Sequence, residues 1–271
     1  MHAPRDWQAI AFNTSPDSDN RIHSDEMAQS YGFKGGLVPG VVVSAYLIHP
    51  GVQAWGMEWL TRGHSKVVIH KPTYDGDSFD VKLTDISDSS YQSALLDSTG
   101  TLNASGEVSL TRLAEPPTMR GDVLVEPKRP PSLASLETMH RLQEVGMSAL
   151  EVCWDQNCEI PSYLKDARAM PALHQVKQGD FANAGFMLGL TNWALAANVY
   201  MNPWIHLQTE SQFYAAVRGG TLLQVECDIQ ALFEKRGHKF VDLNVSVFVQ
   251  KTGQPVMSAL LRAIYKMRSA D

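Results

Sequence analysis

A short polar segment near the N-terminus, residues 17–25, contains side chains that can transfer protons. It includes Asn20, the histidine His23 and carboxylates at Asp19 and Asp25. Histidine changes its charge closest to neutral pH, and a short loop could present a carboxylate beside its ring. Such a group could activate a water molecule. The alternative is a loop histidine that only hydrogen-bonds the surrounding turn.

An apolar stretch follows this loop. The segment Gly35–Gly40, with the sequence Gly-Gly-Leu-Val-Pro-Gly, precedes Val41–Ile48, which is apolar on nearly every side. That pattern is typical of a buried helix or a buried strand. The glycine and proline residues before it favour a helix, and we expect Pro50 and Gly51 to end it.

The rest of the first half is rich in predicted strands. Alternating hydrophobic residues between polar turns predict a short strand before the helix and a four-stranded meander after it. The predicted strands are Trp7–Asn13, Lys66–Lys71, Ser78–Asp85, Tyr91–Leu96 and Leu102–Leu113.

The second half repeats this order of elements. Phe181–Met201 is dominated by good helix formers and has helical spacing. Glycine turns recur at matching places, Gly76 with Gly219-Gly220 and Gly100 with Gly253, which indicates an internal duplication. The four strands predicted after this helix are His206–Val217, Thr221–Phe233, Lys239–Gln250 and Val256–Lys266.

A helix followed by antiparallel strands, twice over, predicts an α+β fold. Two sheets that each wrap a long apolar helix and join edge to edge form a double hotdog. We expect residues 1–114 to form the first repeat and residues 133–271 the second, joined by a proline-rich linker or extended strap at 115–132. The alternative is a pair of unrelated α+β domains.

Two segments of the first half resemble a known family. Asp19-Asn20-Arg21-Ile22-His23 with Gly35–Gly40 resembles the active-site segment of MaoC-like (R)-specific enoyl-CoA hydratases, where a D-x-N-P-[apolar]-H motif precedes a helix start. Residues 69–77, which end in Gly76-Asp77, resemble the family's strand and Gly-Asp turn. The match covers about residues 12 to 85. It implies hydration or dehydration of an acyl thioester.

The resemblance also implies roles for individual residues. His23 acts as acid and base, and Asn20 shapes or orients the site. The backbone N–H groups of Gly40 and Val41, which follow Pro39, face the thioester carbonyl, because the start of a helix offers unpaired donors and a positive dipole end. Gly40 also lets the ligand approach the backbone closely.

The sequence departs from the family motif at two positions. The family's catalytic aspartate, two residues before the asparagine, is replaced by Ser18, and the family's proline is Arg21. Asp19 and Asp25, and behind them Asp17, are the available substitutes. We therefore expect Asp19 or Asp25 to serve with the histidine and Ser18 to border the substrate.

Composition and charge exclude several classes of protein. The net charge of -6 and the pI near 5.8 argue against a nucleic-acid-binding protein, which would carry a basic face. No apolar run approaches the roughly 18 residues of a membrane span. The polar start, Met1–Gln8, lacks a secretory signal, so we expect a cytoplasmic protein.

We expect no metal and no cofactor other than coenzyme A as part of the substrate. His174, His206 and His238 lack metal-ligand spacing, and Trp204 is expected to fill the core. A small basic group could meet coenzyme A phosphates or form a solvated strand face; it consists of His64, Lys66, His70 and Lys71. Two other functions stay open: hydrolysis of the same thioester, and acyl binding without catalysis. A homodimer of the double-hotdog unit is also open.

Overall fold

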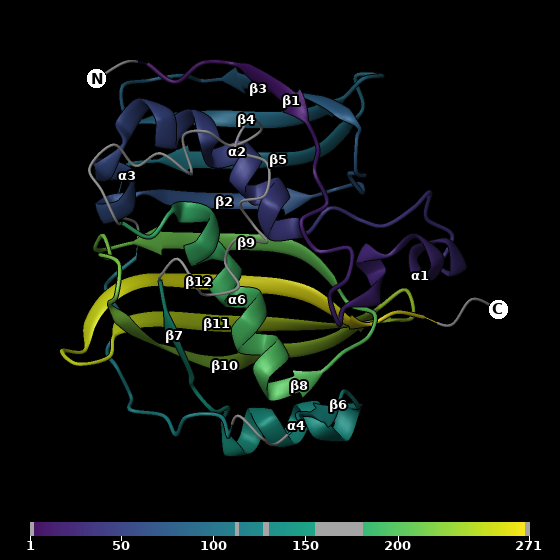
Figure 1. Cartoon of the computed structure of the whole chain (residues 1–271), viewed down its shortest axis with the longest axis vertical. Helices are drawn as coiled ribbons and strands as arrows, with labels where there is room; N and C mark the ends of the chain where they lie inside the picture. Colours follow the sequence, from purple (N-terminus) through teal and green to yellow (C-terminus); the bar gives the residue numbers. More distant parts are fainter. Residues whose placement is uncertain (1–2, 112–113, 127–129, 155–180, 269–271) are drawn as a thin grey trace.

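In the computed structural model, two helices, α2 and α6, lie across the same face of one large antiparallel sheet (Figure 1). The structure describes residues 3–111, 114–126, 130–154 and 181–268. The first half contains β1 (Trp7–Ile10), η1 (Arg21–His23), α1 (Asp25–Ser30), α2 (Gly40–Trp55), α3 (Met57–Arg62), β2 (His64–Ile69), β3 (Ser78–Thr84), β4 (Ser90–Asp97) and β5 (Leu102–Ser109). The second contains β6 (Ser132–Leu133), α4 (Leu136–Val145), β7 (Leu150–Cys153), α6 (Ala184–Asn198), β8 (Val199–Tyr200), β9 (Ile205–Phe213), β10 (Leu222–Lys235), β11 (His238–Val249) and β12 (Gln254–Lys266).

The two halves of the sheet have the same strand order. Within the described residues, ten strands form one sheet in the order β1-β3-β4-β5-β2-β9-β12-β11-β10-β7. Outward from its centre, β2-β5-β4-β3-β1 on one side matches β9-β12-β11-β10-β7 on the other. The halves join where β2 pairs with β9, and the hydroxyl oxygens of Ser65 and Ser211 lie 3.0 Å apart at this junction. The repeated order confirms the predicted joining of two sheets edge to edge.

The predicted four-stranded meander is wrong in one respect. β3, β4 and β5 do form a meander, but β2 pairs with β5 instead of β3. In the same way, β9 pairs with β12 and not with β10. Hydrophobic alternation identifies strands, but it does not reveal which distant strands become neighbours. The crossover brings β2 and β9 to the middle of the sheet.

The glycine turns have the backbone geometry that the duplication predicts. Gly76 precedes β3 with φ of 78°, and Gly220 precedes β10 with φ of 77°. Gly100 and Gly253 lie before β5 and β12 with φ values of 79° and 70°. Residues with a side chain rarely adopt such positive φ values, so these four positions favour glycine.

Helix α2 continues beyond its predicted end. Pro50 and Gly51 lie inside the helix, which ends at Trp55. The hydroxyl of Tyr91 accepts a hydrogen bond from Gly51 N at 3.0 Å and donates one to the Leu47 carbonyl at 3.0 Å. The hydroxyl thus bonds two backbone groups on either side of Pro50, and the helix continues past the proline.

Helix α6 is shorter than its predicted range of 181–201. It begins after Asn183, whose side-chain oxygen accepts a hydrogen bond from Phe186 N at 2.8 Å, a common way to cap a helix. Residues 199–200 belong to β8, which pairs with β6. Helices α2 and α6 contact each other, and nearly all of α2 and most of α6 are buried, which confirms that each half wraps an apolar helix.

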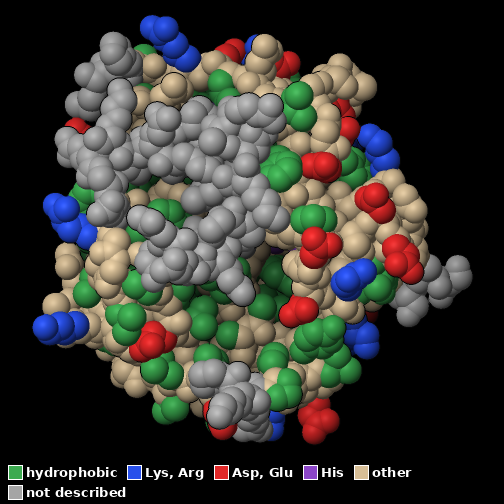
Figure 2. All heavy atoms as spheres, in the orientation of Figure 1, with side chains coloured by type: hydrophobic (Ala, Val, Ile, Leu, Met, Phe, Trp, Pro, Cys, Tyr) green, Lys and Arg blue, Asp and Glu red, His purple; other side chains and the backbone are tan. Residues whose placement is uncertain are grey.

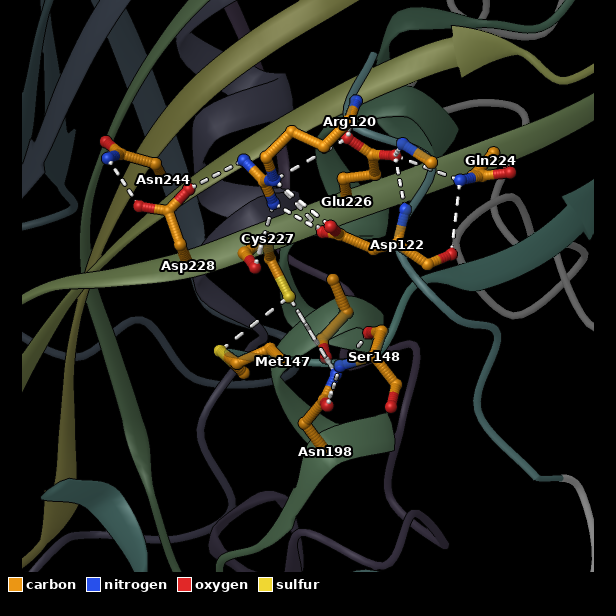
Figure 3. A network of polar contacts seen from close by, with 12 residues as sticks. Arg120, Asp122, Met147, Ser148, Asn198, Gln224, Glu226, Cys227, Asp228 and Asn244 are labelled. Atoms are coloured by element: carbon orange, nitrogen blue, oxygen red, sulfur yellow. Dashed lines mark hydrogen bonds and ion pairs between the residues drawn. The ribbon is translucent and has the colours of Figure 1, made fainter. Parts of the chain in front are cut away.

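Residues 120–122 of the proline-rich segment form a strap that is held against the sheet (Figure 3). The buried carboxylate of Glu226 on β10 accepts hydrogen bonds from the backbone N–H groups of Arg120, Gly121 and Asp122 at 2.8, 2.7 and 3.1 Å. The Arg120 guanidinium bonds Asp122 and Asp228 at 2.6 and 3.0 Å. The strap is therefore fixed to β10 by charged side chains.

The strap and the helices lie on opposite faces of the sheet. Cys227 Sγ lies 3.9 Å from the carbonyl oxygen of Ala194 in α6, so Cys227 points toward the helices. Neighbouring residues of a strand point to opposite faces. Glu226 and Asp228 therefore point away from α6, toward the strap.

On the face of the molecule shown in Figure 2, the Lys and Arg side chains of the described residues are scattered among Asp and Glu, which agrees with the acidic overall charge. Within the described ranges, no helix is long and apolar enough to cross a membrane.

Candidate functional site

The loop that carries His23 is held in place by groups on both sides of its backbone. Asn13 Nδ2 donates a 2.7 Å hydrogen bond to the His23 carbonyl. A side chain at Gly36 would overlap the same carbonyl, so this close packing requires glycine. Asp25 Oδ1 accepts a 2.8 Å hydrogen bond from Gly36 N. The Gly35-Gly36 pair of the sequence motif therefore serves to seat the histidine loop against the start of α2.

The two ring nitrogens of His23 have different surroundings. Nδ1 lies 2.7 Å from the Leu37 carbonyl oxygen, which can only accept, so Nδ1 carries the proton of the neutral ring. Nε2 then has a lone pair, and the Asn20 side-chain amide lies 3.3 Å from it. Burial lowers the pKa of His23 and outweighs the Leu37 hydrogen bond, which raises it. His23 is therefore a neutral imidazole at neutral pH, able to accept a proton at Nε2.

Asn20 connects the histidine loop to the second half of the chain. Its side chain donates to the Trp204 carbonyl at 3.0 Å and accepts from Trp204 N at 3.1 Å. Arg21 N also donates to Asn202 Oδ1 at 3.0 Å. The segment just before β9 thus positions the histidine loop, and the site needs both halves.

His23 and Asn20 lie in the wall of a cavity of about 430 Å³. Apolar side chains form much of the wall, among them Ile22, Leu37, Val43, Trp204 and Ile264. Among the polar residues of the wall, Thr73 and His206 are buried, and His23, Asn20 and Asn192 are partly buried. Within the described part of the chain, no Asp or Glu lines this cavity.

The cavity lies at the start of α2. Gly40, the first residue of the helix, lines it, whereas Pro39 and Val41 are buried and are not among its wall residues. Val42 N and Val43 N both lie within hydrogen-bond distance of the Pro39 carbonyl. The N–H groups of Gly40 and Val41 precede these first bonds and can bind a negatively charged oxygen.

Packing inside the protein gives a second reason for a glycine at position 40. A Cβ atom added there would lie 2.8 Å from the Cβ and ring atoms of His206. Packing against this side chain of β9 therefore requires glycine at position 40. A close approach of a ligand to the Gly40 backbone, which lines the cavity, stays a prediction.

His206 itself is not placed for proton transfer. Its Nδ1 lies 2.9 Å from Asn192 Oδ1, and its Nε2 lies 2.6 Å from Thr209 Oγ1. Both nitrogens therefore have protein partners, and complete burial lowers the pKa of His206 to about 3. His206 supports the cavity wall as a neutral ring. Nothing near it in the sequence points to this site, because it reaches the cavity only through the pairing of β2 with β9.

The carboxylates predicted to assist His23 lie outside the cavity wall. Asp19, Asp17 and Asp25 are exposed, and Asp25 is occupied with Gly36 N. Ser18 is partly buried, and its hydroxyl donates to the Asn20 carbonyl at 3.2 Å, so it borders the loop and not the cavity. No contact of His23 with Asp19 or Asp25 is found among the described residues, because the turn around η1 directs Asn20, Ile22 and His23 to the cavity and leaves both carboxylates exposed.

The small basic group predicted from the sequence is divided between two places. His70 and Lys71 line the cavity, together with His238 and Arg268 of the second half. His64 and Lys66 instead lie within 4 Å of Glu210, at distances of 3.4 and 3.8 Å. Across the described ranges, no group of three or more His, Cys, Asp or Glu side chains could hold a metal ion. His174 lies outside the described residues.

Comparison with known proteins identifies the architecture. No family model and no curated protein matches this sequence. Among solved structures, a conserved hypothetical protein from Mycobacterium tuberculosis with a double hotdog fold is similar over 97% of this chain and 96% of its own, with a TM-score of 0.60 and 15% identity. This chain is a double hotdog.

Two other solved structures that match over nearly their whole length have names that state different activities. A MaoC-like dehydratase is similar over 97% of this chain and 98% of its own, with a TM-score of 0.53 and 12% identity. An acyl-ACP thioesterase from Bacteroides thetaiotaomicron matches over 95% and 96%, with a TM-score of 0.50 and 9% identity. At these identities the matches show the fold, and the function has to be inferred from the site.

Proposed function

We propose that this double hotdog binds an acyl thioester in the cavity at the start of α2 and catalyses its hydration or dehydration, with His23 as the acid–base group. The observation that supports this most strongly is the state of His23. Its Nδ1 is committed to the Leu37 carbonyl, and its neutral Nε2 lies in the wall of a cavity that begins at a helix N-terminus.

One histidine can perform both proton transfers. In hydration, Nε2 of His23 takes a proton from water while the water oxygen forms a bond to the β-carbon of the enoyl thioester. The electron pair of the double bond moves to the thioester oxygen, where the N–H group of Gly40, which lines the cavity at the start of α2, stabilises the charge. The same Nε2–H then protonates the α-carbon, and the ring is neutral again. Dehydration is the reverse.

Asn20 is a positioning residue in this proposal. Its amide holds the imidazole through the 3.3 Å contact and is itself fixed by two bonds to Trp204. Because the contact between the Asn20 amide and His23 Nε2 is long, a water molecule can replace it at Nε2 with little loss of free energy. Ser18 acts only through the Asn20 backbone. Asp19 and Asp25 have no part in the proton transfers, because they lie outside the cavity wall.

The carrier of the acyl group would leave the cavity past a basic rim. Lys71 and Arg268 are exposed, line the cavity and come from different halves of the chain. Cationic side chains at this position suit the phosphate groups of coenzyme A or of a phosphopantetheine arm. We propose no cofactor besides coenzyme A as a part of the substrate.

Thioester hydrolysis is the second candidate. The thioesterase with a similar fold supports it, since the same His23 could direct water to the carbonyl carbon and then protonate the departing thiolate. The absence of Asp and Glu from the described cavity wall favours a third function, acyl binding without turnover.

A screen of enoyl-CoA substrates of increasing chain length separates these functions. We expect the enoyl absorbance to fall without release of free thiol, which marks hydration. Thiol release would instead mark a thioesterase. Stabilisation of the protein by acyl-CoA with neither signal would mark a binding protein. Absence of turnover, thiol release and stabilisation across the series would overturn the proposal.

A further inference from the structure

Thr73 lies beside the start of α2, on the segment between β2 and β3. Its carbonyl oxygen accepts a 2.9 Å hydrogen bond from Val38 N, two residues before Gly40. The residue is only 3% exposed and lines the cavity. Thr73 and His23 therefore both contact the short stretch that leads into the helix, since His23 bonds the neighbouring Leu37.

The hydroxyl of Thr73 has no hydrogen-bond partner among the described residues. Burying a hydroxyl without a partner is unfavourable, and folded proteins usually avoid it. Two other buried side chains share this condition, His49 at Nδ1 and Trp59 at Nε1, but neither lines the cavity. The Thr73 hydroxyl oxygen itself has almost no exposed surface, so it meets a ligand in the cavity after a rotation about the Cα–Cβ bond, which exchanges the hydroxyl with the methyl group. Of the three groups, only that of Thr73 belongs to a residue of the cavity wall and can gain its missing partner from a ligand there.

We infer that the Thr73 hydroxyl donates a hydrogen bond to the carbonyl oxygen of the bound acyl thioester, together with the N–H group of Gly40. The inference rests on the proposed function and adds a specific carbonyl-binding side chain to it. A hydroxyl needs an oxygen or nitrogen partner, and the carbonyl is the polar atom that the helix start would hold at this end of the cavity. The acyl chain itself offers no acceptor.

A pair of ligands that differ at the carbonyl tests this contact. One is a saturated acyl-CoA, and the other is an S-alkyl-CoA thioether of equal chain length in which a methylene group replaces the carbonyl. Binding of both is measured for the wild type, Thr73→Val and Thr73→Ser. Valine has the shape of threonine without the hydroxyl, and serine keeps the hydroxyl.

We expect Thr73→Val to bind the acyl-CoA about 3- to 10-fold more weakly, as for the loss of one hydrogen bond, and to bind the thioether as the wild type does. Thr73→Ser should bind both ligands like the wild type. The melting temperature of ligand-free Thr73→Val should not fall, because no protein bond is lost.

Three results would contradict the contact. Equal weakening of both ligands by Thr73→Val would mean that Thr73 only shapes the cavity. Unchanged binding of both would mean that its hydroxyl does not meet the ligand. A lower melting temperature of free Thr73→Val would show a structural role. If the wild type binds neither ligand, the proposed function itself fails.

Discussion

Two groups of polar side chains are buried in different parts of this double hotdog. One surrounds Glu226 beneath the strap, and the other lines the cavity at the start of α2. Glu226 is 0% exposed, and the backbone of residues 120–122 and the Gln224 amide all donate to its carboxylate. In the cavity, the Thr73 hydroxyl has no partner in the described protein, and His23 Nε2 has only a 3.3 Å contact.

This difference distinguishes polar groups that stabilise the fold from polar groups that can bind a ligand. A buried polar group with every bond satisfied stabilises one conformation and leaves nothing for a ligand. A buried polar group that lacks a hydrogen-bond partner lowers the free energy of unfolding, and a bound molecule that supplies the partner can offset this loss. Substitutions around Glu226 should therefore act on stability, and substitutions of the open cavity groups should act on ligand binding and turnover.

The largest effect is expected on turnover at His23. Replacing His23 with glutamine removes the proton acceptor and keeps a side chain that can donate to Leu37. We expect turnover of the best enoyl-CoA to fall by ~10²–10⁴, as for loss of an acid–base group, with the melting temperature nearly unchanged. Steady-state kinetics and thermal unfolding of the same samples measure both quantities.

The matched controls for this variant are Asp19→Asn and Asp25→Asn. Both carboxylates lie outside the cavity wall, so each change should leave kcat within about twofold of the wild type; Asp25→Asn should act mainly on stability through Gly36. A 100-fold loss of turnover in Asp19→Asn would show that a carboxylate reaches the substrate after all.

The next effect concerns stability under the strap. Glu226→Gln replaces an acceptor oxygen with an amide that faces the N–H groups of residues 120–122. We expect a loss of about 3–5 kcal/mol in the free energy of unfolding, as for a broken buried charged group. Asp228→Asn is the control, because this side chain is 45% exposed and also bonds Arg120, so it should cost below about 1 kcal/mol. Denaturant unfolding that gives equal losses for the two variants would contradict the comparison.

Stability should also fall at acid pH because of buried histidines. Burial lowers the pKa of His49 to about 4 and of His206 to about 3, from an ordinary value of 6.5. Between pH 7 and pH 5 the unfolded chain binds protons at these residues and the folded chain does not, so the free energy of unfolding falls as pH falls. The loss should be about 2 kcal/mol for each histidine.

Denaturant unfolding at pH 7 and pH 5 measures this loss. His49→Phe removes one of these buried rings and should reduce the difference by about 2 kcal/mol. His140→Gln changes an exposed histidine and should leave the difference as in the wild type. A wild-type stability that is equal at the two pH values would show that these rings are not held neutral.

The smallest effect is expected for Gly40→Ala. The new methyl group would lie 2.8 Å from His206, whose ring is held by Asn192 and Thr209 and has little freedom to move. We expect overpacking to lower the free energy of unfolding by about 1–3 kcal/mol. Unchanged stability, measured by denaturant unfolding, together with a lost acyl-CoA affinity would instead show that Gly40 makes room for the ligand.

Much of this fold follows from local features of the sequence. The apolar content of α2 and α6 predicts buried helices, and the glycines at 76, 100, 220 and 253 mark equivalent turns in both halves. The Asn20-to-His23 motif and the glycines after it locate one wall of the cavity. These features are readable because each depends on residues close together in the chain.

Features that depend on distant residues could not be predicted. Pro50 lies inside α2 where the hydroxyl of Tyr91, a residue of the distant strand β4, bonds both Gly51 N and the Leu47 carbonyl. The contribution of Trp204 and His206 to the site arises from the pairing of β2 with β9, which no local pattern reveals. The orientation of Asp19 and Asp25 depends on the path of the chain around η1, which leaves both carboxylates exposed.

The most direct test of the proposed site is a crystal structure of the protein with a bound saturated acyl-CoA. We predict that the thioester carbonyl lies within hydrogen-bond distance of Gly40 N or Val41 N, with the α- and β-carbons next to His23 Nε2. Coenzyme A should leave the cavity past Lys71 and Arg268. An acyl group bound elsewhere, or one whose carbonyl points away from the start of α2, would contradict the account.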